Sequence, residues 1–572
     1  MKKIIAVLIT ITLLLSAVCI APVSSAESED RIKFSLATDL HIEDIRDTLE
    51  VNFPENELYF HADGSGNLYD EATGLTNTLL SQSVENGVDF VLLAGDLTRS
   101  GTEAEHRYVA SLLKEFTEKT GIKVWLISGN HDYHNSTPDE FKEYYYDVCY
   151  KDALTVDDVT ASYTADLPNN FRLIAADSNK APEDGDGLTE RTFNWIEKQV
   201  RQAREDGKEI LFTEHHPVLE HLYLGRYLMK NFMVRNHEDV AEMFCSWNIQ
   251  YVFTGHEHGN DIAKYESKKT GKVLYDVLTT SLSSYPLEYR LVSYGKSGVD
   301  IKMQRIDECD FSSLVGGYNE KQLELMKNDY NEYAYGYFKY AIEKKILKYT
   351  SPDFIKDKLG QKSGALASAV DTLMTLVNEA LEMPLYDSGD GSQSIEALAL
   401  KKGVTLPESE YKTLLDLATT LVAMHYHGDE NMPVRENIEA ELLVKGLNTG
   451  LEYILSGTEG EAVNILAKIT LGQFGADGQA LSRWFTAVAQ GRDDTYEIAA
   501  DVLYPFLEKY TIDEAPADRD VSLPAFGETV EKESNVSSVM TFLQKILSFV
   551  KFILKMVSTF TGAQINLPEF LG

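Results

Sequence analysis

Short apolar segments alternate with longer helical patterns from about Arg31 to Ile306. The short segments have the length of strands and are rich in β-branched and aromatic residues, whereas the longer ones, such as Glu103–Lys119, repeat apolar residues at helical spacing. Strands that alternate with helices predict an α/β domain, because parallel strands need crossover connections. The strand candidates are Ile32–Ala37, Phe90–Ala94, Val124–Ile127, Phe171–Ala176, Ile210–Thr213 and Tyr251–Thr254.

The pattern of predicted secondary structure changes toward the middle of the chain. Tyr289–Tyr294 and Val299–Arg305 flank a Gly-Lys-Ser-Gly turn and predict an antiparallel hairpin. After Cys309, strand patterns give way to long helical ones punctuated by glycine and proline. Because 572 residues are too many for one ordinary core, we predict an α/β domain over 27–308 and an all-α domain over 309–510.

The C-terminal part is predicted in two pieces. Residues 511–537 are acidic and contain Pro516 and Pro524, which favours a linker or a draped segment. Segment 538–572 begins with an amphipathic helix candidate, Ser538–Phe560, with a single polar stripe. Its three lysines make a transmembrane helix unfavourable. The helix either packs against the helical domain or makes a peripheral contact with a membrane or cell wall.

The N-terminus has the composition of a secretory signal peptide over 1–26. Lys2 and Lys3 precede an apolar run that ends in small residues, so cleavage is expected after Ala26 and the mature chain outside the cell. A lipoprotein anchored through Cys19 is the less favoured alternative, because Val18 stands where a small residue is usual.

Charge and cysteine content exclude some functions. The formal charge of −37 repels polyanions, so sequence-independent nucleic-acid binding is not expected. Bound cations can reverse that field locally, which leaves a small phosphate ester possible as substrate. Cys149, Cys245 and Cys309 are too few and too widely spaced to indicate a disulfide framework.

Five predicted strands end in residues that can bind metal. Loops at the carboxyl ends of strands meet in one crevice of an α/β sheet. The glycines that precede three of the candidates allow tight turns and close backbone approach. A spacing of two residues, as in Asp39 and His41, puts both side chains on one side of extended chain. The segments are Thr38-Asp39-Leu40-His41, Gly95-Asp96, Gly129-Asn130-His131-Asp132, Glu214-His215-His216-Pro217 and Gly255-His256-Glu257-His258.

The candidate ligands combine carboxylate, imidazole and amide groups without thiolates, a set that suits Mn, Fe or Zn. Seven ligands are too many for one ion and are natural for two divalent or trivalent metal ions. The predicted metal ligands are Asp39, His41, Asp96, Asn130, His215, His256 and His258.

This ordered set of five motifs resembles the calcineurin-like metallophosphoesterases over roughly residues 31–306. The resemblance implies two sheets packed face to face with helices outside, a four-layer αββα sandwich. It also implies that Asp96 bridges two metals. The first metal would be held by Asp39, His41 and His258, and the second by Asn130, His215 and His256. His131 would be a catalytic group beside the scissile phosphate, and Asp132 would orient it.

Differences from the motifs of particular branches narrow the choice of branch within this superfamily. Gly95–Gly101 lacks the second aspartate of the protein Ser/Thr phosphatases in this superfamily. His41 and Arg99 replace a glycine and a tyrosine of the purple acid phosphatases. The pattern is most similar to the class III branch, which contains cyclic-nucleotide and glycerophosphodiester phosphodiesterases.

Several neighbouring residues have more than one interpretation. His216 competes with His215, but the resemblance implies that the first histidine, two residues before proline, is the ligand. Because neighbours in extended chain point opposite ways, His216 is then expected to have a supporting role. His134, His425 and His427 are expected at the surface. Four residues either bind the non-reacting part of the substrate or only pack loops: Arg99, Tyr133, Tyr285 and Arg290.

The predicted function is a secreted hydrolase of phosphodiesters or phosphomonoesters, with diesters preferred, in which two metals generate the attacking hydroxide. The alternative is a surface binding protein with an inactive metallophosphoesterase-like domain and a helical domain that binds a partner or a membrane. The complete set of ligand residues counts against that alternative.

Overall fold

The computed structural model describes residues 31–43, 65–179, 188–221, 232–310, 318–358, 363, 365–387, 389, 393–428, 432–455, 475–511 and 515–525. Two predicted elements, the signal peptide over 1–26 and the helix over Ser538–Phe560, lie outside these residues. Among the helices of the described part, none is both long enough and apolar enough to cross a bilayer.

The first sheet has six strands in the order β13-β12-β11-β1-β2-β3. β1, β2 and β3 are parallel, whereas β11 and β12 form the predicted antiparallel hairpin beside β1. A central strand such as β2, Phe-Val-Leu-Leu, is wholly apolar because both of its faces are buried. The strands are β1 (Ile32–Ala37), β2 (Phe90–Leu93), β3 (Lys123–Leu126), β11 (Glu288–Gly295), β12 (Gly298–Arg305) and β13 (Val521–Leu523).

The second sheet has seven strands in the order β4-β5-β6-β7-β8-β10-β9. β6, β7, β8 and β10 are parallel, and antiparallel strands complete both edges. The strands are β4 (Thr155–Val156), β5 (Tyr163–Asp166), β6 (Phe171–Ala175), β7 (Glu209–Thr213), β8 (Tyr251–Thr254), β9 (Asp261–Glu266) and β10 (Val273–Leu278).

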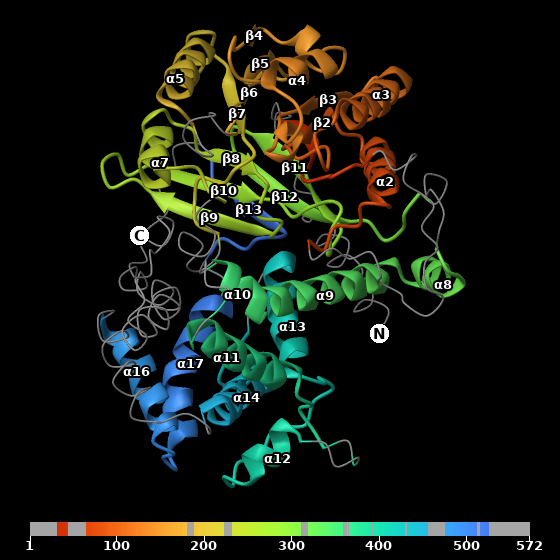
Figure 1. Ribbon diagram of the computed structural model, residues 1–572. Coiled ribbons are helices and arrows are strands. Elements are labelled where there is room, and N and C mark those ends of the chain that lie inside the picture. The colour runs from red at the N-terminus through yellow and green to blue at the C-terminus, as the bar shows by residue number, and fades with distance from the viewer. Residues whose placement is uncertain are drawn as a thin grey trace, which may run out of the picture.

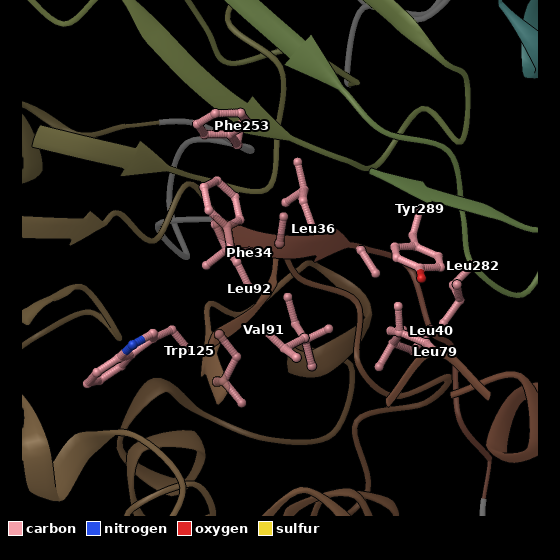
Figure 2. Close-up of a cluster of buried hydrophobic side chains, with 14 of the residues drawn as sticks. Phe34, Leu36, Leu40, Leu79, Val91, Leu92, Trp125, Phe253, Leu282 and Tyr289 are labelled. Atoms are coloured by element: carbon pink, nitrogen blue, oxygen red, sulfur yellow. The ribbon is translucent and has the colours of Figure 1, made fainter. Parts of the chain in front are cut away.

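The two sheets pack face to face around an apolar core (Figure 2). Phe34 of β1 and Phe253 of β8 are fully buried and meet edge to face, with ring centroids 5.6 Å apart. Helices cover the outer faces, α2 and α3 on the first sheet and α5 and α7 on the second (Figure 1). The predicted αββα sandwich is therefore confirmed. The helices are α2 (Ala72–Glu85), α3 (Glu103–Thr120), α5 (Glu190–Glu205) and α7 (His237–Ser246), with α4 (Pro138–Tyr144) beside α3.

Between residues 318 and 511 the described parts of the chain are mainly helical, as predicted, and lie against one side of the sandwich (Figure 1). This helical region has a core of its own, which includes Leu417, Leu442 and Trp484. Helices α9 (Tyr330–Tyr349) and α13 (Leu414–His427) lie between the sheets and most of the other helices. These others are α8 (Glu320–Asn328), α10 (Pro352–Lys358), α11 (Ala365–Glu382), α12 (Ile395–Leu400), α14 (Ile438–Leu455), α16 (Gly475–Ala489) and α17 (Thr495–Thr511).

The segment expected to be a linker or a draped segment, 511–537, is structured where it is described. Val521–Leu523 forms β13, which pairs antiparallel with β12. Asp518 is buried and accepts a hydrogen bond from the Ile262 amide at 2.8 Å. Of the two predicted alternatives, 515–525 is therefore a draped segment and not a free linker. An edge strand offers unpaired backbone groups to any short extended segment, and local composition does not reveal such a distant pairing.

Replacement of Phe34 tests the inter-sheet core. We expect Phe34→Ala to lower the free energy of unfolding by about 3–5 kcal/mol, because the cavity lies between two sheets that cannot collapse into it. Urea denaturation followed by tryptophan fluorescence measures the loss. Phe116→Ala, at a half-buried position of α3, is the matched control and should cost clearly less. Equal losses of unfolding free energy in the two variants would show that the inter-sheet contact stabilises the fold no more than a half-buried position does.

Candidate metal centre

Potential ligand atoms converge where β1, β2, β7 and β8 end. Three groups of side chains each place one ligand atom per residue within 4.8 Å of the others. The structure thus brings together six of the seven predicted ligands and adds His131. The groups are Asp39, His41 and His258; His41, Asp96 and His131; and Asp96, His215 and His256.

Asp96 joins these groups. Its Oδ2 lies 3.5 Å from His215 Nε2 and 3.9 Å from His41 Nε2. Its Oδ1 accepts a hydrogen bond from the His131 amide at 2.8 Å. The Asp96 carboxylate therefore lies between the imidazoles of the two sheets, where a bridging ligand would be required.

Several ligand atoms at this place are buried without a hydrogen-bond partner among the described residues. They include Asp39 Oδ1, His215 Nε2 and the amide oxygen of Asn130, the seventh predicted ligand. His41 Nε2 and His258 Nε2 lie 3.2 Å apart, close enough for both to bind one cation or for one ring to donate to the other. Buried polar atoms are seldom left unpaired. Cations between these atoms would satisfy them, so the residues fit a metal centre.

The electrostatics also favour positive charge here. Burial opposes ionisation of Asp39 and Asp96, but neighbouring imidazoles, His258 and His215 respectively, outweigh it and lower the pKa of each carboxyl. Burial likewise opposes protonation of His215, yet Asp96 raises its pKa to about 9. Burial lowers the pKa of His41 and His256 to about 3. Two carboxylates and the neutral imidazoles of His41 and His256 form a suitable environment for cations.

The backbone at five of the seven predicted ligands is left-handed rather than extended. The extended geometry inferred from the two-residue spacing is therefore wrong. Backbone hydrogen bonds at 3.0 Å, from the Asp39 amide to Gly95 O and from the His41 amide to Asp96 O, lock the first two loops together in this shape. Positive φ angles occur at Asp39 (53°), His41 (47°), Asp96 (49°), His256 (75°) and His258 (62°).

The close approaches predicted at three glycines are all present. A Cβ on Gly95 would lie 2.4 Å from His215 Nδ1. A Cβ on Gly129 would lie 2.1 Å from Asp96 Oδ1, and one on Gly255 would lie 2.1 Å from Thr38 Oγ1. Real Cβ atoms do not approach neighbours so closely. These glycines are therefore required for the ligand loops to pack against one another.

His131 lies beside the ligands, but Asp132 does not orient it. His131 Nδ1 donates to Arg99 O at 2.7 Å, while its ring lies 4.7 Å from that of His41. The Asp132 carboxylate instead accepts from the amides of Leu97, Thr98 and Gly129. Asp132 therefore ties the Asp96 loop to the Asn130 loop, and the catalytic role predicted for it is wrong.

The remaining histidines divide between supporting and surface positions. His216 is buried and its Nδ1 lies 3.0 Å from Ser178 Oγ, which agrees with a supporting role. His134 is exposed, with its ring 4.4 Å from that of His131. His425 was expected at the surface and is instead buried against Gly259, because α13 ends on the loop that carries His258.

The four candidates for substrate contact differ in their surroundings. Arg99 lies at the edge of the centre, paired with Glu43 at 2.6 Å and stacked on Tyr69. Tyr133 donates to Asp177, and the fully buried Arg290 donates to backbone carbonyls, so both have structural partners. Tyr285 packs in an aromatic cluster, with its ring 5.1 Å from that of Tyr335.

Three residues of interest around the centre are not among the site residues predicted from the sequence. Both carboxylate oxygens of Glu214 are buried without a hydrogen-bond partner in the described structure, and burial raises its pKa well above the usual range. The Phe232 ring lies 4.7 Å from that of His256. Burial, with Asp39 and Glu257, raises the pKa of Tyr426 on α13 to about 12. Phe232 and Tyr426 belong to no motif, whereas Glu214, directly before His215, could have been noticed.

Gly129→Ala tests the close packing of the ligand loops. The added methyl group would collide with the Asp96 carboxylate, so we expect metal affinity to fall at least about 10-fold. Metal content after dialysis and calorimetric titration measure it. Gly450→Ala, which meets only ordinary contacts in helix α14, should leave metal binding unchanged. Full metal affinity in Gly129→Ala would mean that Asp96 is not held as described.

Comparison with known proteins agrees with this geometry. Residues 32–260 match the family model of the calcineurin-like phosphoesterases. A protein of Arcobacter nitrofigilis named "probable glycerophosphodiester phosphodiesterase GpdQ" is 28% identical over 192 residues, which are 31% of this chain and 65% of that protein. The chain thus spans slightly less than two thirds of that relative.

Solved structures of related type are more distant in sequence. A dimetal phosphatase from Danio rerio is 14% identical, with a TM-score of 0.36, over 48% of this chain and 95% of its own. Purple acid phosphatase PPD1 from yellow lupin is 15% identical, with a TM-score of 0.31, over 48% and 52%. The fold assignment rests on the two sheets and their core rather than on these superpositions. Together, the family match and the ordered motifs identify residues 32–260 as a calcineurin-like phosphoesterase domain.

Proposed function

We propose that this protein is a two-metal phosphoric ester hydrolase that acts outside the cell and prefers diesters to monoesters. One observation carries the proposal: two ionised carboxylates and a set of imidazoles converge with buried ligand atoms that lack other partners. An inactive relative acting as a binding protein would have no need to keep this costly arrangement.

The ligands divide into two sets around Asp96. Asp39, His41 and His258 would hold one metal, with Asp96 shared. The other metal, again with Asp96, would be held by Asn130, His215 and His256. Mn, Fe and Zn suit these donors. When bound, two such cations supply a hydroxide nucleophile near neutral pH and neutralise charge on the phosphoryl oxygens.

His131 acts on the leaving group. Because its Nδ1 proton is held by Arg99 O, its Nε2 is the nitrogen left to exchange a proton with the substrate. Its ring lies beside His41 and Asp96 and so borders the place where a phosphoryl group would bind. A proton delivered from Nε2 to the departing ester oxygen completes the hydrolysis.

An aromatic ring beside the centre supports the diester preference. The Phe232 ring, which is 37% exposed, lies 4.7 Å from that of His256 of one ligand set. A diester carries two organic groups, so one can contact this ring while the other departs, whereas a monoester carries only its leaving group. The name of the relative from Arcobacter nitrofigilis, a glycerophosphodiester phosphodiesterase, points the same way.

Location outside the cell is supported by the apolar N-terminal run and the small residues before Glu27. Expression in a secreting bacterial host should yield a chain in the medium or periplasm whose first residue is Glu27. Edman sequencing checks this. A chain that keeps Met1, or that carries lipid on Cys19, would contradict it.

Contact with a membrane is proposed for Ser538–Phe560, whose polar stripe is rich in lysine. The mature chain should float with anionic liposomes, and a chain truncated before Ser538 should not. Co-flotation of both forms, or of neither, would contradict the proposal.

Removal of metal should abolish hydrolysis. Protein treated with chelator is expected to lose turnover of bis(p-nitrophenyl) phosphate and to regain it with Mn²⁺, Fe²⁺ or Zn²⁺. Turnover of p-nitrophenyl phosphate should follow the same pattern at a lower kcat/KM. If the reloaded protein hydrolyses neither ester, the binding-protein alternative replaces the proposal.

Substitution of His131 tests its proton transfer. We expect His131→Ala to lower kcat about 10²–10⁴-fold while metal content stays at the wild-type level. His134→Ala, which removes the exposed neighbouring imidazole, is the matched control and should change kcat less than about 3-fold. A His131→Ala chain that keeps wild-type kcat would remove His131 from the mechanism.

A further inference from the structure

Two segments from the C-terminal half pack against the loop that carries His256 and His258. This loop ends in Gly259 and Asn260. One contacting segment is the end of α13, His425–Gly428, and the other is 515–523, which we call the return segment because it leads back to the first sheet. In Figure 1, β13 lies at the side of the sandwich that faces the helical region, and α13 is one of the helices next to that side.

The end of α13 touches the loop closely. A Cβ on Gly259 would lie 2.8 Å from His425 Nε2, and one on Gly428 would lie 2.6 Å from Asn260 O. Gly259 and Asn260 are both buried. The loop and the helix end are therefore in direct contact, with no room for side chains at these two glycines.

Arg519 of the return segment fastens this contact. It donates to both carboxylate oxygens of Glu288, each at 2.7 Å, and also to His427 O at 2.7 Å. Glu288 is 1% exposed, so the pair is largely withdrawn from water on the acidic side. Paired charge-assisted hydrogen bonds of this kind fix geometry more strongly than single neutral ones.

A series of hydrogen bonds leads from Arg519 to His258, a predicted metal ligand. Glu288 Oε2 accepts a hydrogen bond from Asn260 Nδ2 at 3.2 Å. Asn260 Oδ1 accepts from the Thr280 amide at 3.1 Å, and Thr280 Oγ1 donates to His258 O at 2.6 Å. Asn260 and Thr280 are fully buried, so this chain of contacts is shielded from competing water.

We propose that Arg519 and the end of α13 position His258 for metal binding, so that residues far outside the catalytic domain complete the metal centre. This inference rests on the metal binding proposed above. Arg519 is a positioning residue, since it acts through Glu288, Asn260 and Thr280. Residues that hold a ligand in place typically change metal affinity 10–100-fold when they are replaced.

Calorimetric titration of the metal-free full chain with Mn²⁺ tests the proposal. We expect Arg519→Gln to weaken one of two Mn²⁺ affinities about 10-fold and to alter the visible spectrum of the Co²⁺-loaded chain. Arg519→Lys should have an intermediate Mn²⁺ affinity. Lysine keeps the positive charge but cannot donate two parallel hydrogen bonds to the Glu288 carboxylate. Arg435→Gln, which removes a similar ion pair with Glu508 on the helical surface, is the control and should bind as wild type.

A second pair of variants avoids Arg519. Gly259→Ala should weaken the same Mn²⁺ affinity by collision with His425, and Gly259→Ala with His425→Ala should restore it. Circular dichroism confirms folding in each case. A wild-type chain that binds no Mn²⁺ contradicts the proposed function and this role with it. Wild-type Mn²⁺ affinity in Arg519→Gln and Gly259→Ala contradicts the positioning role alone.

Discussion

Two buried carboxylates impose the central constraint on this protein. Asp39 and Asp96 follow neighbouring parallel strands of the first sheet, are at most 1% exposed, and remain ionised despite burial. A buried charge is tolerated only beside compensating charge. The second sheet supplies that compensation through the histidines that follow β7 and β8. The face-to-face packing of the two sheets is thus also what brings the negative and positive halves of the centre together.

The backbone conformation of the ligand loops is unfavourable by itself and must be stabilised by contacts with the rest of the domain. Five of the predicted ligands have positive φ, a conformation that costs a residue other than glycine about 1–3 kcal/mol. The cost is met locally by backbone hydrogen bonds between the Asp39 and Asp96 loops and by the Asp132 carboxylate, which accepts three backbone amides. Asp132 therefore contributes to the centre by holding two loops in an unfavourable shape, although it does not reach His131.

The sequence was sufficient for whatever depends on local pattern. Strand ends, α5, the β11–β12 hairpin and the groups brought together around Asp96 all follow from periodicity and from the position of polar residues after apolar runs. It was insufficient where contacts are distant or geometry is unusual. The pairing of Val521–Leu523 with β12, the burial of His425 and the left-handed ligands depend on partners that no nearby residue indicates. Asp132 was assigned wrongly because adjacency to His131 suggested a contact that a 3₁₀ turn directs elsewhere.

The family model ends at residue 260, but the first sheet does not. β11 and β12 follow that residue, and β13 is added only after the whole helical region has been traversed. The helical region is therefore an insertion between two antiparallel neighbours of one sheet, anchored to it at both ends. An insertion tied in this way has far less freedom than a domain on a single flexible linker, because both of its connections must remain in register with β12. The contact of His425 with the loop that carries His258 is consequently held by the helical region as well as by the phosphoesterase fold.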